Sequence, residues 1–377
     1  METKKYRFDE VTINFDKKRI PLSSAQREKR QGTFRYYGAQ GVIDHVDDYI
    51  FDGTYLLIAE DGENLKSKKQ NIAQVVDGQF WVNNHAHIVQ GNEQCDTRFL
   101  CYLINSMDLS GYVTGSAQPK LSQANLNAVT LSLPTLAEQK RIVEYLYMLD
   151  QKIDVNRQIN DNLYEIVNAY YTSLFKDVEC EMTTIGNYAE RIYSGGTPTT
   201  SNAAYWDGTF GWFSSGETRN RFVISTEKSI TQTGIDNSST KLASKHDIVM
   251  ASAGQGFTRG QTSMLLIDTY VNQSVIVIHA DRNILPYLFW NLANRYEELR
   301  AISDSSSIRG SLTTKMIAAF EIPCANNDVI QTFSGFAWAV IPQIENNLLE
   351  NERLAALRDS LLPKLMTGEI DVSAIQL

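Results

Sequence analysis

The chain has 377 residues, of which 43% are hydrophobic and 21% charged. This length and composition fit a folded protein of two domains, and they exclude a disordered chain or a small disulfide-stabilised scaffold. The four cysteines form no C-x-x-C pair, the N-terminal residues alternate in charge, and no run of about 18 apolar residues occurs. We therefore expect a cytoplasmic protein without disulfides, structural zinc, a signal peptide or a membrane span.

The net charge of −9 argues at first against a polyanionic partner. The acidic excess is concentrated, however, because residues 136–178 carry −2 and residues 324–377 carry −4. Residues 17–37 contain seven basic side chains and one acidic side chain, with Phe34, Tyr36 and Tyr37 close by. A basic stretch flanked by aromatic residues can neutralise phosphates, although such a stretch can also be an ordinary solvated face.

Short apolar runs bounded by Gly, Asp and Asn predict β-strands in two separate parts of the chain. One or two short helices are expected to interrupt the strands in each part, which indicates an α+β fold class. The expected strands cover residues 55–59, 79–82, 86–89, 248–251, 264–267 and 275–278.

From Ile142 to Leu174, apolar residues recur at alternating spacings of four and three, and two asparagines, Asn156 and Asn160, interrupt the pattern. Such a heptad seam predicts a long helix. A second seam runs from Phe333 to Leu361, with Arg358 at one seam position. Each helix would cover roughly 38 residues and span about 57 Å, which is too long for an ordinary helix inside a small domain.

The two seams place their asparagines at the same phase, which indicates a tandem duplication with a period of roughly 190 residues. Matching seam residues are Ile153 and Ile344, Asn156 and Asn347, Asn160 and Asn351, and Leu163 and Leu354. The segment 99–106 likewise aligns with 287–294. We expect two similar domains and two long helices, with boundaries at 1–135, 136–178, 179–323 and 324–377.

Each long helix has one apolar stripe, so the simplest arrangement packs the two seams against each other. An antiparallel pair is favoured because a whole domain returns the chain between them, and the duplication implies a pseudo-two-fold repeat. Asparagines in such a seam select one register at a cost in stability. The alternative is two unrelated amphipathic helices, each lying on its own domain.

A search for catalytic motifs finds no phosphate-binding loop, no H-E-x-x-H zinc motif and no G-x-S-x-G nucleophile elbow. His85 and His87 share one face of a strand but have no third ligand close in sequence, so two ordinary strand histidines are favoured over a metal site. Glu138 in the first turn of a long helix is explained by the helix dipole. The sequence therefore predicts a binding protein with no catalytic, cofactor or metal site.

Two further motifs flank the predicted helices: residues 133–143 read Leu-Pro-Thr-Leu-Ala-Glu-Gln-Lys-Arg-Ile-Val, and residues 361–370 read Leu-Leu-Pro-Lys-Leu-Met-Thr-Gly-Glu-Ile. The first resembles the central conserved region of the specificity subunits of type I restriction-modification enzymes, and the second resembles the usual end of that family. Residues 324–330 depart from the usual glutamate-glutamine pattern, which leaves the start of the second helix open. Further stretches that resemble the recognition domains of the family are 36–44, 51–62, 83–87, 194–199, 205–206 and 211–212.

The resemblance implies a DNA-binding subunit with no catalytic site. Its partners would be double-stranded DNA, two DNA methyltransferase subunits and two ATP-dependent motor-nuclease subunits. The partners would use S-adenosylmethionine, ATP and magnesium, and this chain would bind no cofactor. Each domain would read one half of a bipartite, asymmetric target, and the helix pair would set the gap between the halves.

Readout of DNA needs Arg, Lys, Gln or Asn on loops held by a rigid domain. On residue type and Gly/Ser-rich surroundings, the expected contacts are Lys17, Lys18, Arg19, Arg27, Lys29, Arg30, Gln118, Lys120, Arg219, Arg221, Gln255, Arg259 and Arg309. Two alternatives stay open. The chain could serve a methylation-only or fused-type system without a motor, or it could be a coiled-coil interaction scaffold that binds no DNA.

Overall fold

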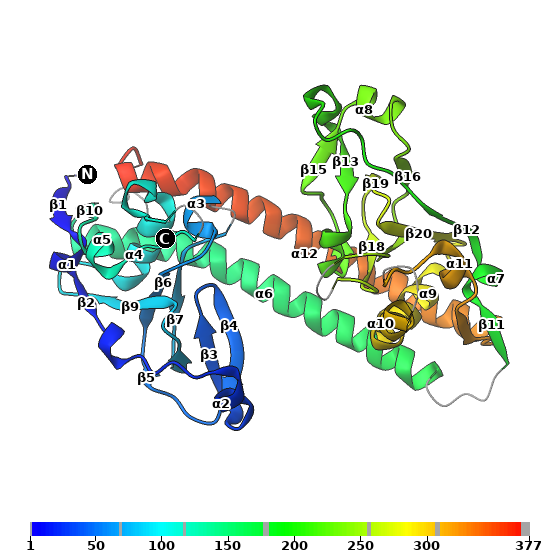
Figure 1. Cartoon of the computed structure of the whole chain (residues 1–377), viewed down its shortest axis with the longest axis horizontal. Coiled ribbons are helices and arrows are strands. Elements are labelled where there is room, and N and C mark those ends of the chain that lie inside the picture. The colour runs from blue at the N-terminus through cyan, green and yellow to red at the C-terminus, as the bar shows by residue number, and fades with distance from the viewer. Residues whose placement is uncertain are drawn as a thin grey trace. The chain divides into compact units, whose positions relative to one another are not determined.

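The computed structural model describes residues 2–67, 70–115, 118–175, 181–254, 258–305 and 310–370. The chain divides into two compact units: Met1–Lys152 with Arg353–Leu377 is the first, and Ile153–Glu352 is the second. Each unit combines a sheet-containing domain with part of both long helices (Figure 1). Within the described residues, no helix is both long enough and apolar enough to cross a membrane.

The domain of the first unit contains two four-stranded sheets, with strand orders β2-β9-β6-β7 and β4-β3-β8-β5. A short ribbon of β1 and β10 leads into the long helix α6. The elements are β1 Lys4–Arg7, α1 Phe8–Val11, β2 Thr12–Asn14, η1 Asp16–Lys18, α2 Ser24–Glu28, β3 Gln31–Gly38, β4 Gly41–Val46, β5 Phe51–Asp52, β6 Tyr55–Ala59, α3 Asn64–Ser67, β7 Ala73–Val76, β8 Gln79–Val82, β9 Ala86–Gly91, α4 Thr97–Ser106, η2 Ser110–Tyr112, α5 Gln123–Asn127, β10 Thr130–Leu133 and α6 Leu136–Phe175.

Strand β6 shows how the apolar run of residues 55–59 builds two cores at once. Side chains alternate between the two faces of a strand. Leu56 and Ile58 pack in the cluster that includes α4 and the long helices, whereas Leu57 packs between the two sheets against Phe80 and Val82. A strand buried on both faces reads as a continuous apolar run, and this explains the pattern found in the sequence.

The domain of the second unit repeats this plan with a five-stranded sheet, β12-β20-β17-β18-β14, and a four-stranded sheet, β15-β13-β19-β16. Here β11 and β21 form the ribbon that leads into α12. The elements are β11 Met182–Thr184, α7 Ile185–Tyr188, β12 Ala189–Ser194, η3 Ala203–Tyr205, β13 Trp206–Phe213, η4 Ser215–Arg219, β14 Phe222–Val223, β15 Lys228–Ile230, α8 Gln232–Asp236, β16 Lys241–Ala243, β17 Ile248–Ala251, β18 Thr262–Leu265, β19 Thr269–Val271, β20 Val275–Ala280, α9 Leu285–Asn294, α10 Tyr296–Ser305, α11 Thr314–Ala318, β21 Glu321–Pro323 and α12 Asn327–Thr367.

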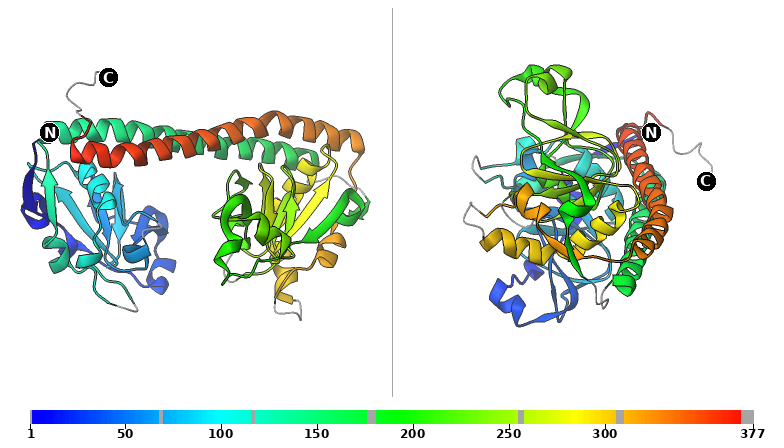
Figure 2. Two further views of the ribbon diagram at one scale, coloured as in Figure 1. Left: turned by 90° about the horizontal axis from the view of Figure 1, so that it is seen from above. Right: turned by 90° about the vertical axis from the view of Figure 1, so that its right-hand side faces the viewer.

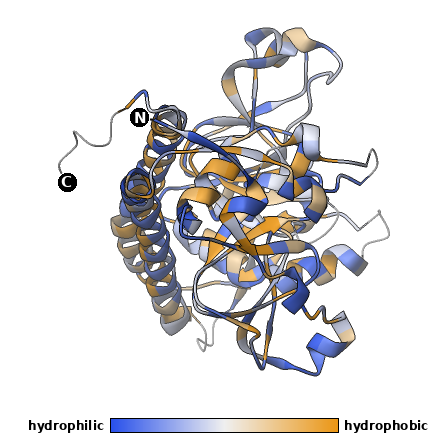
Figure 3. Cartoon of the chain, turned by 90° about the vertical axis from the view of Figure 1, so that its left-hand side faces the viewer, coloured by the Kyte–Doolittle hydropathy of each residue, from blue (hydrophilic) through white to orange (hydrophobic). Residues whose placement is uncertain are grey.

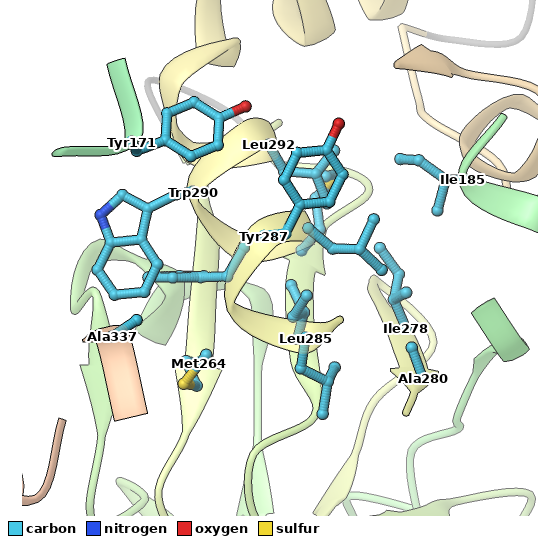
Figure 4. Close-up of a cluster of buried hydrophobic side chains, with 14 of the residues drawn as sticks. Tyr171, Ile185, Met264, Ile278, Ala280, Leu285, Tyr287, Trp290, Leu292 and Ala337 are labelled. Carbon is cyan, nitrogen blue, oxygen red and sulfur yellow. The ribbon is translucent and has the colours of Figure 1, made fainter. Parts of the chain in front are cut away.

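Strand β20 divides its side chains as β6 does. Ile276 and Ile278 face the helix-lined cluster, while Val275 and Val277 face the second sheet. Figure 4 shows the helix-lined cluster, in which Tyr171 of α6 lies near Tyr287 and Trp290 of α9. In both domains a sheet therefore lies between a helix-lined core and a second sheet. This mixture of helices and sheets confirms the expected α+β class.

The long helices have 40 residues in α6 and 41 residues in α12, close to the predicted length. In the first unit, Ile142 and Leu146 of α6 share a buried cluster with Leu365 of α12. In the second unit the ring centroids of Tyr170 and Phe333 lie 6.2 Å apart. Within each unit the two helices run side by side, and hydrophobic residues recur between hydrophilic ones along them (Figures 2 and 3).

The Leu-Pro-Thr-Leu-Ala-Glu-Gln motif fixes the start of α6. Thr135 N–H donates to the Glu138 carboxylate at 2.9 Å, and Glu138 N–H donates to the Thr135 hydroxyl at 3.4 Å, which is a reciprocal cap. Gln139 is fully buried; its side-chain oxygen accepts from Asp96 N–H at 2.9 Å and its amide donates to the Gln94 carbonyl. Asp96 in turn caps α4. The motif thus joins the long helix to the domain. At α12, Asn326 accepts from Asp328 N–H at 2.9 Å instead.

Candidate nucleic-acid interface

A buried network of charged side chains joins three segments of the first unit that are far apart in the sequence. Asp16 begins η1 directly after β2, and His87 lies on β9. His87 Nδ1 is 2.6 Å from the Asp16 carboxylate, and His87 Nε2 is 2.8 Å from the Leu121 carbonyl oxygen. The His87 side chain is 1% exposed and that of Asp16 is 5% exposed. Both ring nitrogens face oxygen atoms, an arrangement that an imidazolium, with its two N–H donors, satisfies in full.

The pKa values of the two groups follow from this geometry. Burial by itself would lower the pKa of His87, but the hydrogen bonds to Asp16 and Leu121 and the nearby carboxylates of Asp16 and Glu60 outweigh burial, so the pKa is raised. Burial by itself would raise the pKa of Asp16, yet hydrogen bonds from His87 and from Ile88 N–H hold that pKa below its ordinary value. Each group of the pair therefore favours the charged form of the other.

Arg19, a predicted DNA contact, belongs to the same network. Its guanidinium donates to Glu60 and to the Ala86 carbonyl, each at 2.9 Å, and lies 3.6 Å from Asp16. Lys17 and Lys18 are exposed on η1. Arg19 thus holds the segment in place, whereas Lys17 and Lys18 are exposed, with Lys18 Nζ 5.3 Å from the ring centroid of Phe15.

The arginines around α2 are also held by partners. Arg27 donates to Asp44 at 2.8 Å and to the Leu22 carbonyl at 2.8 Å, and the hydrogen bond from Arg27 holds the pKa of Asp44 below its ordinary value. Arg30 donates to Asp47 at 2.9 Å, and its guanidinium lies 4.8 Å from the ring centroid of Trp81. Lys29, at the end of α2, is exposed.

Gln118 and Lys120 belong to a loop that returns to the same network. Both side chains are exposed, and Lys120 Nζ is 3.3 Å from Glu60. The Lys120 N–H donates to the Thr114 carbonyl at 2.8 Å, and Leu121 N–H donates to the Glu60 carbonyl at 2.8 Å. Glu60 therefore contacts both this loop and Arg19, the residue that follows η1.

In the second unit the predicted contacts are more widely distributed. Arg219 donates to the Gly216 carbonyl at 2.9 Å and forms an ion pair with Glu227. The Arg221 guanidinium lies 4.2 Å from the ring centroid of Tyr164 on α6. Arg259 donates to the Gly310 carbonyl at 2.6 Å and pairs with Asp304. The predicted contacts Gln255 and Arg309 lie outside the described residues.

The seam asparagines meet across the two helices in the second unit. Asn156 donates to Asn351 at 3.0 Å, and Asn347 donates to Asn160 at 2.8 Å. The remaining seam positions are at least half-buried: Ile153 and Ile344 are buried, and Leu163 and Leu354 are intermediate.

The sequence interpretation missed the role of Asp16, Glu60 and His87. The His85-Ala-His87 pattern was a visible signal, but it was weighed only as a metal site. In the described part of the chain, no group of three or more His, Cys, Asp or Glu side chains could hold a metal ion. His85 instead pairs with Asp61 at 2.7 Å.

Comparisons with known proteins agree on one protein family. The family model of the type I restriction modification DNA specificity domain matches residues 2–165 and 178–329. A putative type I restriction enzyme specificity subunit of Haemophilus influenzae is 36% identical over 138 residues, which are 37% of this chain and 35% of that relative. The chain thus matches about a third of the length of that relative.

Two further similarities extend over most of the chain. The specificity subunit of the type I restriction enzyme HindI of Haemophilus influenzae is 21% identical over 404 aligned positions, covering 85% of this chain and 84% of the relative. The crystal structure of the S subunit of a type I restriction-modification system from M. genitalium superposes with a TM-score of 0.60 at 14% identity, covering 97% of this chain and 96% of that one. At 14% identity, the similarity to the M. genitalium structure is a similarity of fold.

Proposed function

The chain belongs to the family of type I restriction-modification DNA specificity domains, and we propose that it reads two separated halves of one asymmetric DNA target. Recognition of DNA is the function of this family, and specificity subunits of type I systems are not catalytic. The chain therefore supplies sequence recognition to a complex whose chemistry is performed by other subunits.

The observation that carries the proposal is the repetition of one fold with different surface residues. Both units place a strand such as β6 or β20 between a helix-lined core and a second sheet. The first unit presents lysines on η1 and on the loop to Lys120, whereas the second presents Arg219 and Arg221 around η4. Similar scaffolds with different contact residues favour two different half-sites.

We assign the recognition domains to residues 1–135 and 179–323, and the helices that separate them to 136–178 and 324–377. The two helices would form an antiparallel coiled coil whose length sets the gap between the half-sites. The proposed DNA contacts remain Lys17, Lys18, Arg19, Arg27, Lys29, Arg30, Gln118, Lys120, Arg219, Arg221, Gln255, Arg259 and Arg309.

The partners proposed are two DNA methyltransferase subunits and two ATP-dependent motor-nuclease subunits. An apolar stripe on α6 supports a helical partner: Val155, Ile159 and Ile166 are 48%, 39% and 54% exposed, and their spacings of four and seven place them on one face. S-adenosylmethionine, ATP and magnesium would be used by the partners, and this chain would bind none of them.

The test uses the chain purified together with its methyltransferase partner. Sequencing of methylated bases in DNA modified by the complex should give one bipartite asymmetric site, and a duplex with that site should be retarded in a gel in the presence of excess competitor DNA. A complex that retards no duplex at low salt would favour an interaction scaffold. ATP-dependent cleavage of unmethylated DNA separates a restriction complex from a methylation-only one.

A further inference from the structure

Two segments that carry proposed DNA contacts meet at one buried side chain in the first unit. Lys17 and Lys18 lie on η1, which begins at Asp16, and Gln118 and Lys120 lie on the loop that ends at Leu121. One ring nitrogen of His87 lies 2.6 Å from the Asp16 carboxylate, and the other lies 2.8 Å from the Leu121 carbonyl oxygen.

We propose that His87 is a positioning residue for DNA recognition by the first unit, and that its protonated ring holds η1 and the Lys120 loop in one arrangement. This inference rests on the proposed DNA-reading function. His87 itself is buried and touches no DNA; it acts through the two segments that it joins.

The mechanism follows from the number of protons on the ring. An imidazolium has two N–H donors, whereas a neutral imidazole has one. When the ring loses a proton, either Asp16 or the Leu121 carbonyl loses its hydrogen bond to His87 inside a buried site, and the loss of a buried hydrogen bond is costly. The segment that loses its hydrogen bond is then held less firmly.

The surroundings of His87 favour the charged ring. Asp16 faces it from η1, and Glu60 faces it from the end of β6. Arg19 lies 3.6 Å from Asp16 and 2.9 Å from Glu60, and Lys120 lies 3.3 Å from Glu60. These ion pairs connect Asp16 on η1, Glu60 after β6 and Lys120 on the loop, and His87 on β9 bonds to Asp16.

The second unit contains a histidine that serves as a matched control. His279 on β20 is 2.6 Å from Asp247 and 3.6 Å from Glu190, and its side chain is 27% exposed. Neither partner belongs to a segment with a proposed DNA contact. His279→Gln therefore changes a histidine–carboxylate pair of similar geometry without loosening η1 or the Lys120 loop.

The experiment compares His87→Gln, His279→Gln and the unchanged chain, each in complex with the methyltransferase partner. Affinity is measured between pH 6 and pH 9 for the target and for targets altered in one half at a time. For His87→Gln we expect discrimination at one half-site to fall roughly tenfold, the factor expected for loss of one buried hydrogen bond. Discrimination at the other half-site stays unchanged.

The pH dependence of DNA affinity distinguishes a protonated, positioning His87 from a His87 that only stabilises the fold. Because the pKa of His87 is raised in the folded chain, the unchanged complex and His279→Gln should bind progressively more weakly as pH rises through that pKa, at one half-site only. His87→Gln should bind weakly across the range, with no such change.

Wild-type discrimination and a wild-type pH profile for His87→Gln would overturn the inference while leaving the proposed function intact. If His87→Gln fails to fold, the test is the pH dependence of DNA affinity of the unchanged complex. An affinity that does not change with pH at either half-site overturns the inference. A complex with no sequence-specific binding would overturn both proposals.

Discussion

The side-chain amide of Asn347 on α12 donates a hydrogen bond of 2.8 Å to the side-chain oxygen of Asn160 on α6. Asn156 makes the companion bond to Asn351 at 3.0 Å. In the duplicated sequence, however, Asn156 corresponds to Asn347 and Asn160 to Asn351. Each asparagine therefore bonds to the equivalent of its neighbour, because the two helices run in opposite directions in this unit. The crossed pairs fix one register for the helices.

Replacement of both members of one bonded pair, Asn160→Leu with Asn347→Leu, should raise the melting temperature. Asn347 is buried and Asn160 is half-buried; Gln343 also donates to Asn347, and Asn160 donates to the Ile344 carbonyl. Apolar packing replaces the two bonded amides, but the signal that selects the register is lost, so self-association should increase. Asn156→Leu with Asn347→Leu is the matched control, because it removes one member of each pair. That variant should lose about 1–3 kcal/mol of unfolding free energy for each amide left unsatisfied. Equal melting temperatures for the two double variants would contradict the crossed pairing, and sedimentation reports the association.

Removal of seven residues from each helix should shorten the gap in the DNA target. Deletion of residues 151–157 together with 350–356 removes Asn156 and Asn351 as a pair and keeps Asn160 and Asn347. Seven helical residues span about 10 Å, or about three base pairs. Methylation of a library of targets with varied gaps measures the change. Deletion from one helix alone should instead destabilise the chain, and an unchanged gap after the paired deletion would exclude the helices as the spacer.

Asp150→Ala should destabilise the first unit. The Tyr102 hydroxyl donates to Asp150 at 2.5 Å, and the Arg358 guanidinium donates to Asp150 at 2.7 Å. Burial, together with the hydrogen bond to Asp150, raises the pKa of Tyr102, so the hydroxyl keeps its proton at neutral pH. We expect a loss of about 1–2 kcal/mol in thermal unfolding, since Arg358 is partly solvated and keeps Asp359 as a partner.

The control for Asp150 lies on the same helix. Asp154 pairs with Arg157 at 3.0 Å, and both side chains are more than half exposed. Asp154→Ala should change the unfolding free energy by less than about 0.5 kcal/mol. Equal effects of the two substitutions would show that Asp150 has no structural role.

Lysines and arginines of the basic segment should behave differently in DNA binding. Lys17→Ala, Lys18→Ala and Lys29→Ala should each weaken binding to every duplex alike and reduce the salt slope by about one unit. Arg27→Ala should lower the melting temperature in addition to weakening DNA binding, because Arg27 is also held by Asp44 and by the Leu22 carbonyl. The melting temperature, measured together with binding as a function of salt concentration, separates the two classes. A lysine variant with an unchanged salt slope would remove that residue from the interface.

Exchange of residues 183–320 for the corresponding part of a relative should change one half of the target only. The exchanged stretch contains the five-stranded and four-stranded sheets of the second unit and ends before α12 begins at Asn327. The first half-site and the gap depend on other residues, so both should be preserved. Sequencing of methylated bases in DNA modified by the hybrid complex gives the result. A change in both halves at once would falsify independent reading by the two domains.

The sequence by itself determined the long helices, the duplication and the strands of the cores. Heptad spacing and runs such as residues 55–59 depend only on neighbours along the chain, and helices and strands form from local periodicity. The Leu-Pro-Thr-Leu-Ala-Glu-Gln motif could likewise be recognised, because its capping bond joins Thr135 to Glu138 within one helical turn.

Only the tertiary structure decided which charges face solvent. Local counting gave residues 17–37 a strong positive charge, yet Asp44, Asp47 and Glu60 come from later strands and turns and pair with three of the four arginines of that stretch. The same holds for His87, whose partners lie 71 and 34 residues away in the sequence. Ion pairs and buried hydrogen bonds depend on distances in space, and the pairing of strands sets those distances without leaving a periodic signal in the chain.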